Sequence, residues 1–95
     1  MPSYVIFMRE GAVVDPEAMA AYQQGNREGP PDPNIKPLSV YGELETIEGE
    51  PCEGMVILEF PTREAAKDWY NGPYGERAKL RQKAAPYRGF IVDGL

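Results

Sequence analysis

Two short runs of β-forming residues, 3–9 and 55–60, carry apolar side chains at both odd and even positions. Successive side chains of a strand point to opposite faces of a sheet, so these runs are typical of strands that are covered on both sides. A 95-residue chain buries only roughly 60–65% of its unfolded surface, which leaves little material for two covering layers. The pattern therefore predicts a small sheet with helices on one face and another cover on the second face.

Helix and turn signals mark the other elements of the first half. Asp15-Pro16-Glu17 predicts a helix start, with an N-cap, a proline at the first helical position and an acid near the positive end. Gly25 offers a stop for this helix. Residues 26–37 are rich in Gly and Pro and predict a loop, which serves either as a flap or as a connector. Residues 38–47 have the pattern of a strand with one apolar and one polar face.

The second half has a similar order. Thr62 is a good N-cap, and an apolar stripe that includes Ala66, Trp69 and Tyr70 predicts a helix after it. Residues 71–73 end that helix, residues 74–85 give a further helical pattern, and residues 87–93 read as the last strand. We therefore predict one α+β domain over residues 1–95 with βαββαβ order. Its four-stranded antiparallel sheet would carry the helices on one face, as in the ferredoxin-like arrangement.

The second face of this sheet would expose apolar side chains from the strands at residues 3–9 and 55–60. A monomer rarely exposes a large apolar patch, so we expect the face to pack against a second copy across a two-fold axis. This homodimer would form a dimeric α+β barrel. Charge is also uneven, with acids gathered at residues 43–53 and bases at residues 77–88. These groups form either two solvated surfaces or a contact between subunits.

Several chemistries are disfavoured by composition. The chain has no histidine, which removes Ser-His and Cys-His pairs, histidine-based metal sites and the usual haem ligand. It has neither a GxGxxG turn nor a phosphate-binding loop. The net charge of −5 argues against nucleic acid. Cys52 lies between acidic residues that oppose nucleophilic use, and no apolar run reaches membrane-spanning length. We expect a cytoplasmic protein with no metal, cofactor, nucleic-acid partner or membrane partner.

Carboxylates, phenols and arginines remain as candidates for a site. Glu59 ends an apolar strand, where partial burial would suit a general base, although pairing with an arginine explains it more simply. Glu43 is similar, but an exposed strand face also accounts for it. Arg81 lies on one helical stripe with Tyr74 and either clamps an anion or pairs with an acid, and Arg9 has the same two readings. The phenols that either line a cavity or fill the core are those of Tyr22, Tyr41, Tyr70 and Tyr74.

Residues 58–74, LEFPTREAAKDWYNGPY, together with ELETIEG at residues 43–49 and FIVDG at residues 90–94, resemble the bacterial family called domain of unknown function 1330. The resemblance covers nearly the whole chain. It implies a dimeric α+β barrel, and it implies little about chemistry because the family has no established activity. The chain departs from the family at residues 29–37, where relatives more often have a shorter, Gly-containing segment, and this departure bears on the shape of a pocket mouth.

Our first functional hypothesis is a cofactor-independent protein that binds or transforms a small organic acid or carbonyl compound. Glu59 would be the base, Tyr70 or Tyr74 the donor to an oxyanion, and Arg81 the anion clamp. The predicted catalytic residues are Glu59 and Tyr70, and the predicted ligand-binding residues are Tyr22, Tyr41, Glu43, Tyr74 and Arg81. The alternative is a structural or regulatory dimer without catalysis, in which these polar residues form interface pairs.

Overall fold

Four strands and three helices make up the computed structural model, which describes residues 1–28 and 32–95. The elements in chain order are β1 (Ser3–Arg9), α1 (Pro16–Glu28), β2 (Lys36–Val40), β3 (Gly54–Phe60), α2 (Arg63–Asn71), α3 (Gly75–Ala84) and β4 (Tyr87–Asp93). The strands β1, β3 and β4 agree with the sequence pattern to within one residue. The helical pattern of the second half is confirmed as two helices separated by a break after Gly72.

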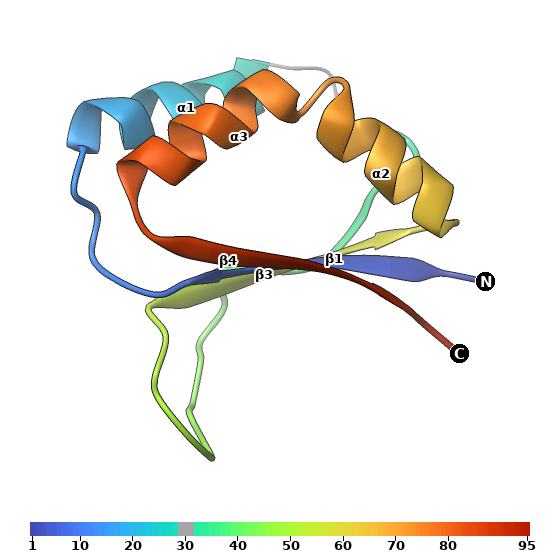
Figure 1. Ribbon diagram of the computed structural model, residues 1–95, viewed down its shortest axis with the longest axis horizontal. Helices are drawn as coiled ribbons and strands as arrows, with labels where there is room; N and C mark the ends of the chain where they lie inside the picture. The colour runs from blue at the N-terminus through green and yellow to red at the C-terminus, as the bar shows by residue number, and fades with distance from the viewer. Residues whose placement is uncertain (29–31) are drawn as a thin grey trace.

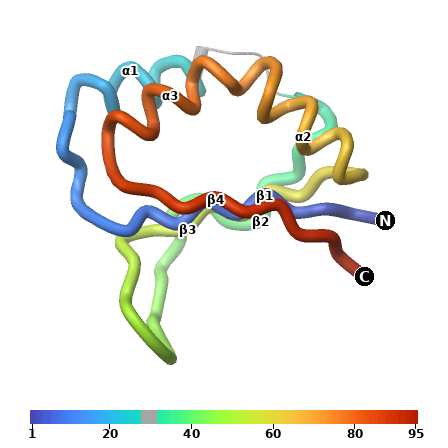
Figure 2. Tube along the Cα trace, in the orientation of Figure 1, coloured from blue at the N-terminus to red at the C-terminus, as the bar shows by residue number. Residues whose placement is uncertain are grey.

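The strands form one antiparallel sheet in the order β2-β3-β1-β4. This is the ferredoxin-like order that the sequence predicts. All three helices lie over one face of the sheet, and the two chain ends lie at the same side of it (Figure 1). The helices arch over the sheet, with α1 packed mainly against α3 and α2 closer to β1 (Figure 2).

Both predicted helix caps are confirmed. The backbone NH of Ala18 donates to Asp15 Oδ1 over 3.0 Å, and that of Ala65 donates to Thr62 Oγ1 over 3.0 Å. The predicted helix end at Gly25 is wrong, because α1 continues to Glu28. One glycine inside a helix costs only about 1 kcal/mol relative to alanine, and the packing of α1 on α3 favours continuation. The predicted loop over residues 26–37 falls partly outside the described residues, at 29–31.

Strand β2 is shorter than predicted and begins earlier, at Lys36. It has an irregularity between Pro37 and Ser39, and it ends where Tyr41 adopts a left-handed backbone with φ of 52°. Residues 42–53, which we call the β2–β3 loop, have no regular pairing and extend away from the sheet on the side opposite the helices (Figures 1 and 2). Alternating hydrophobicity predicted a strand here, but no neighbouring strand reaches this far to pair with it.

The two faces of the sheet differ in cover. The face toward the helices holds the main core, in which Val5, Phe7 and Phe60 pack with side chains of α2 and α3. The alternate positions Ile6, Ile57 and Val92 point to the other face, which no described helix covers. Val92 is 47% exposed there. We call this side the open face. Its apolar residues are Tyr4, Ile6, Met8, Met55, Ile57, Phe90 and Val92.

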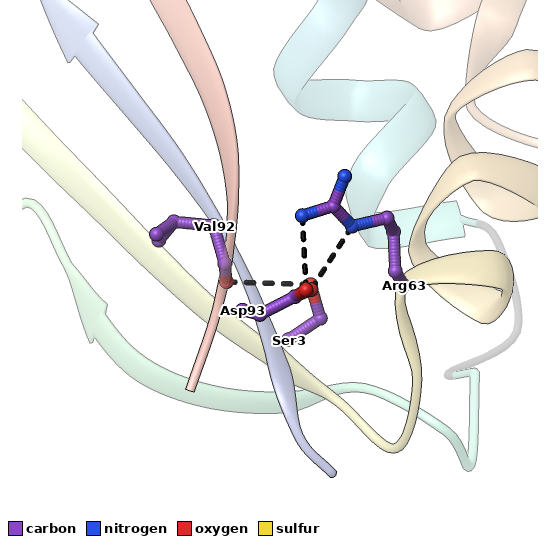
Figure 3. Close-up of polar contacts among 4 residues, drawn as sticks. All are labelled: Ser3, Arg63, Val92 and Asp93. Carbon is purple, nitrogen blue, oxygen red and sulfur yellow. Dashed lines mark hydrogen bonds and ion pairs between the residues drawn. The ribbon is translucent and has the colours of Figure 1, made fainter. Parts of the chain in front are cut away.

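A polar cluster ties the end of β4 to α2 and β1 (Figure 3). Arg63 at the start of α2 donates from Nε and Nη2 to the two carboxylate oxygens of Asp93, over 3.0 and 2.9 Å. The hydroxyl of Ser3, which is fully buried, lies 3.3 Å from Asp93 Oδ1 and from the carbonyl of Val92. Hydrogen bonding from Arg63 holds the pKa of Asp93 below its ordinary value. These contacts hold α2, β1 and β4 together at one end of the sheet.

Candidate functional site

A cavity of about 900 Å³ lies between the helices α1 and α3 and the covered face of the sheet. This volume falls within the usual range for small-molecule sites. Its walls are mostly apolar, with a polar group of phenols, amides and arginines at one side. The described lining residues are Phe7, Met19, Tyr22, Gln23, Asn26, Arg27, Asp32, Ile35, Pro37, Val40, Tyr41, Val56, Leu58, Trp69, Tyr74, Arg77 and Arg81.

Tyr74 is the centre of the polar group. It follows the break between α2 and α3, where its backbone NH donates to the carbonyl of Trp69 over 3.0 Å. Its ring stacks on Trp69 at 4.2 Å between centroids and on Phe7 at 5.8 Å, which leaves the residue 2% exposed. Burial and the adjacent Tyr22 raise the pKa of Tyr74 well above its ordinary value. The phenol therefore stays neutral in the fold.

Arg81 reaches Tyr74 because Tyr74, Ala78 and Arg81 lie at positions i, i+4 and i+7, on one stripe of α3. Its Nε donates to the Tyr74 hydroxyl oxygen over 3.1 Å. The guanidinium lies 4.1 Å from the ring centroid of Phe7 and 4.7 Å from that of Tyr87. With 3% of its surface exposed, Arg81 is one of the most buried polar residues of the described chain.

The charge of Arg81 has no ionic partner among the side chains that the structure describes. Each of the ion pairs found there uses another base, namely Arg63, Lys79, Lys83 or Arg88. Moving a cation out of water costs several kcal/mol even after relaxation. Each aromatic contact returns about 0.5–2 kcal/mol, and the hydrogen bond from the charged guanidinium to Tyr74 about 1.5–3 kcal/mol. A buried cation without a described acidic partner therefore borders the cavity.

Helix α1 supplies the opposite wall. Its inward stripe includes Ala18, Met19 and Tyr22, and the hydroxyl of Tyr22 forms a hydrogen bond with that of Tyr74. One turn later, Asn26 Oδ1 accepts from Arg77 Nη1 over 3.0 Å. The guanidinium of Arg77 lies 5.2 Å from the ring centroid of Tyr74. Two arginines therefore approach the same tyrosine, one at its oxygen and one at its ring.

Tyr41 closes the cavity near the end of β2. A positive φ is unusual for an aromatic residue, and it costs about 1 kcal/mol or more unless the surroundings hold it. Here the Tyr41 hydroxyl lies 2.6 Å from that of Tyr87, and its ring packs over Gly54. Burial and the bond to Tyr87 raise the pKa of Tyr41. Arg9 lies 5.8 Å from the Tyr41 ring centroid, and its buried Nε has no hydrogen-bond partner among the described residues.

A smaller cavity of about 280 Å³ adjoins the first, and Phe7 and Arg81 line both. Tyr70 and Gln82 belong to the smaller one, and their side chains are 3.4 Å apart, with the Gln82 amide donating to the Tyr70 hydroxyl. The shared wall means that the guanidinium of Arg81 stands between the two spaces.

The structure brings some of the predicted site residues together and separates others. Tyr22, Tyr74 and Arg81 form one hydrogen-bonded chain, and Tyr41 lines the same large cavity. Tyr70 lies at the neighbouring small cavity. The two carboxylates are elsewhere. Glu59 pairs in register with Tyr4 on the open face, and Glu43 is exposed in the β2–β3 loop.

The separation of Glu59 from the cavity follows from strand alternation. Phe60 and Leu58 face the helices, the first in the core and the second in the cavity lining, so Glu59 between them points to the open face. Its cross-strand neighbours there are Tyr4 and Lys36. The geometry therefore does not place Glu59 beside Tyr74 or Arg81.

Two residues that our sequence analysis did not single out belong to the site. Tyr87 stacks on Arg81 and bonds to Tyr41, and Asn26 holds Arg77 at the cavity. Tyr87 has a readable signal, because it alternates with Gly89 and Ile91 on one face of β4. Asn26 has a weaker signal, since it shares a helix face with Tyr22 only if α1 continues through Gly25.

Within the described parts of the chain, no cluster of three or more His, Cys, Asp or Glu side chains is placed to hold a metal ion. No helix within residues 1–28 and 32–95 combines the length and apolar character needed to cross a membrane.

Comparison with known proteins identifies the family. The family model described as domain of unknown function DUF1330 matches residues 2–95. The chain belongs to this family. The DUF1330 chain is also similar to a crystal structure of RPA0582, a protein of unknown function from Rhodopseudomonas palustris, with 22% identity and a TM-score of 0.65 over 99% of this chain and 82% of that one.

A structure of methylated RPA0582 gives a similar result, with 23% identity and a TM-score of 0.62 over 99% of this chain and 81% of that one. These likenesses show the fold. No curated protein matches the DUF1330 chain. The family and the fold are therefore established, while the function has to be argued from the geometry of the cavity.

Proposed function

We propose that this DUF1330 protein binds a small organic acid in the cavity between its helices and its sheet. The observation that carries the proposal is Arg81, a buried arginine at the cavity wall with no carboxylate partner among the described side chains. A guanidinium presents five N–H donors in a planar fork that fits a carboxylate. Among the described residues, only Nε of Arg81 has a hydrogen-bond partner, which leaves the terminal nitrogens for a ligand.

The surroundings of Arg81 support an acid with an apolar body. The walls facing the polar group include Phe7, Val56, Leu58 and Trp69, which bury hydrocarbon or aromatic surface. Phe7 and Tyr87 hold the guanidinium plane in place. A buried cation that is already held in position binds an anion more strongly than the same cation in water would.

The test is titration calorimetry of the whole chain with 4-phenylbutanoate and with its neutral amide. We expect the acid to bind at least about tenfold more tightly than the amide, because a hydrogen-bonded charge is lost in the amide. Arg81→Met should remove this preference, and the matched control Arg63→Met should keep it. Equal affinity for acid and amide in the unaltered protein would exclude the anion role of Arg81.

The proposal concerns binding. Glu59 receives no role in it, since it lies on the open face. Tyr70 has its hydroxyl at the small cavity, so a part in turnover would require a ligand that reaches past Arg81. If turnover accompanies binding, Arg81 and Tyr22 would contact the ligand, and Glu59 would not.

We also propose that a second copy of the chain covers the open face, as a homodimer. The support is the group of apolar side chains there, with Phe90 41% and Val92 47% exposed. This assembly is compatible with acid binding and equally with the alternative of a structural or regulatory dimer without catalysis.

With one free cysteine, Cys52, the chain suits the reducing cytoplasm, which we propose as its location.

Analytical ultracentrifugation of Ile6→Lys tests the dimer. Ile6 lies on the middle strand pair of the open face, and a lysine there would face the partner's apolar residues. We expect this variant to sediment as a monomer at micromolar concentration. Val14→Lys, at a residue 73% exposed outside the sheet, is the matched control and should sediment like the parent. If the unaltered protein also sediments as a monomer at this concentration, the proposed homodimer is wrong.

A further inference from the structure

In the polar group around Tyr74, the chemistry of the side chains decides which atom donates and which accepts in each hydrogen bond. A guanidinium has no acceptor, so in the 3.1 Å contact Arg81 Nε donates and the Tyr74 oxygen accepts. The proton of Tyr74 must then find another acceptor. Because Tyr74 is 2% exposed, solvent does not offer one, and a buried donor left without a partner is costly.

The oxygen of Tyr22 is the acceptor that the structure provides. Tyr74 therefore donates to Tyr22, and the chain runs from Arg81 through Tyr74 to Tyr22. The proton of Tyr22 meets no acceptor among the described residues, and Tyr22 lines the large cavity. Each end of the chain thus offers donors to the cavity: the terminal nitrogens of Arg81 at one end and the hydroxyl of Tyr22 at the other. Hydrogen bonds in such a chain polarise one another, which strengthens the last donor.

Asn26 has the same polarity. It uses its carbonyl oxygen to accept from Arg77, which leaves its NH2 group as a donor. Asp32, the one carboxylate on the described lining, has the opposite polarity, and its Oδ1 accepts from the backbone NH of Asn34 over 2.8 Å. A ligand that meets Arg81, Tyr22 and Asn26 must supply acceptors. An amine or another donor would face unpaired N–H and O–H groups.

The two ends of the chain also set a spacing. Arg81 Nε and the Tyr22 hydroxyl both contact the oxygen of Tyr74, and the free terminal nitrogens of Arg81 share one carbon with Nε, so the free donors of the two residues lie close to that oxygen. Two acceptor oxygens on adjacent carbons of a ligand suit such closely spaced donors, with a carboxylate on the guanidinium and a carbonyl oxygen on the hydroxyl. From this geometry we infer that the ligand is a 2-oxo acid with an apolar or aromatic body, held at its carboxylate by Arg81 and at its oxo group by Tyr22.

This inference rests on the proposed function and refines it by naming the class of acid. The apolar body would extend toward Val56, Leu58 and Trp69, which line the same cavity away from the arginine. The oxo group adds one hydrogen bond from a neutral donor. A bond of this kind changes affinity by about tenfold.

The test compares 4-phenyl-2-oxobutanoate with 4-phenylbutanoate, which lacks only the oxo oxygen, by titration calorimetry on the full chain. We expect the oxo acid to bind about tenfold more tightly. Tyr22→Phe should abolish that difference between the two acids. Tyr4→Phe, a matched loss of one phenol on the open face, should keep the difference.

The outcomes distinguish the 2-oxo acid inference from the proposed binding of an acid. If both acids bind equally to the unaltered protein, or if Tyr22→Phe keeps the difference, the 2-oxo acid inference is overturned while acid binding stands. If neither acid binds, the proposed function fails and the inference fails with it. A circular dichroism spectrum of Tyr22→Phe like that of the parent shows that its result comes from the lost hydroxyl and not from misfolding.

Discussion

Arg63 and Arg81 lie on successive helices of the same sheet face and have opposite surroundings. Arg63 is exposed and bonds to both carboxylate oxygens of Asp93 (Figure 3). Arg81 is buried between two aromatic rings, and no described carboxylate pairs with it. An exposed pair adds little to stability because water and salt screen it, whereas a buried lone cation costs stability. The difference is the reason why we propose a ligand-binding role for Arg81 and none for Arg63.

The largest expected effect is on the stability of the ligand-free protein. We expect Arg81→Met to leave the free energy of unfolding unchanged or to raise it by up to about 4 kcal/mol, because an apolar side chain of similar length replaces an incompletely compensated charge. Urea denaturation of both proteins measures the change. A loss of more than about 2 kcal/mol would make Arg81 a structural residue and would break the contrast with Arg63.

The next effect concerns the oxygen that Arg81 contacts. Tyr74→Phe leaves Arg81 Nε buried without an acceptor, so we expect it to lower the free energy of unfolding by about 1–3 kcal/mol. Tyr70→Phe is the matched control, since its hydroxyl has a longer contact with Gln82, and it should cost less. Denaturant titration of the two variants measures the difference. If the two variants lose the same free energy of unfolding, the hydrogen bond from Arg81 to Tyr74 contributes no more than the one from Gln82 to Tyr70.

A third effect appears at alkaline pH. The pKa of Tyr74 is raised, so its phenol stays neutral in the fold at pH values where the unfolded chain ionises, from about pH 10. This contribution to stability is fully present below that pH and is lost as pH rises above it, at up to about 1.4 kcal/mol per pH unit. Tyr74→Phe should flatten the decline between pH 10 and 11. Parallel curves for parent and variant would contradict the expectation.

The smallest effect belongs to the exposed pair. Because the pKa of Asp93 is lowered, its contribution is present above the pKa of the unfolded chain, near 4, and is lost as pH falls through the lower pKa of the fold. We expect Asp93→Asn to be slightly less stable than the parent at pH 6, and equal to it at the acid end. Thermal melts at both pH values, repeated in high salt, test this. If high salt does not reduce the difference in stability at pH 6, Asp93 stabilises the fold by more than its ion pair with Arg63.

The fold was largely predictable because its signals are local. Asp15 and Thr62 mark helix starts through their own side chains, and the apolar runs of β1 and β3 are continuous. The length of β2 was not predictable, since a strand needs a neighbour and none reaches the β2–β3 loop. Gly25 misled for a related reason, because the contact of α1 with α3 overrides its weak helix propensity.

The site was predictable only where one element contains it. Arg81 and Tyr74, which caps the start of α3, share one helical stripe, so spacing alone placed them on the same side, although the bond between them was not predicted. The bond from Tyr74 to Tyr22 depends on how α1 packs on α3, which no local pattern reveals. Glu59 lies on a strand that is apolar on both faces, and such a strand gives no sign of which face meets the helices. The sequence therefore identified the arginine and could not orient the carboxylate.

Gly54 has a consequence for how the specificity of this protein could be altered. A methyl group at that position would lie 2.6 Å from Tyr41 Cδ1, so the ring would have to swing away. Tyr41 lines the large cavity, whereas Gly54 does not. A single substitution outside the cavity lining would thus change the shape of the pocket from behind, which makes position 54 a starting point for altering which of the proposed acid ligands fit.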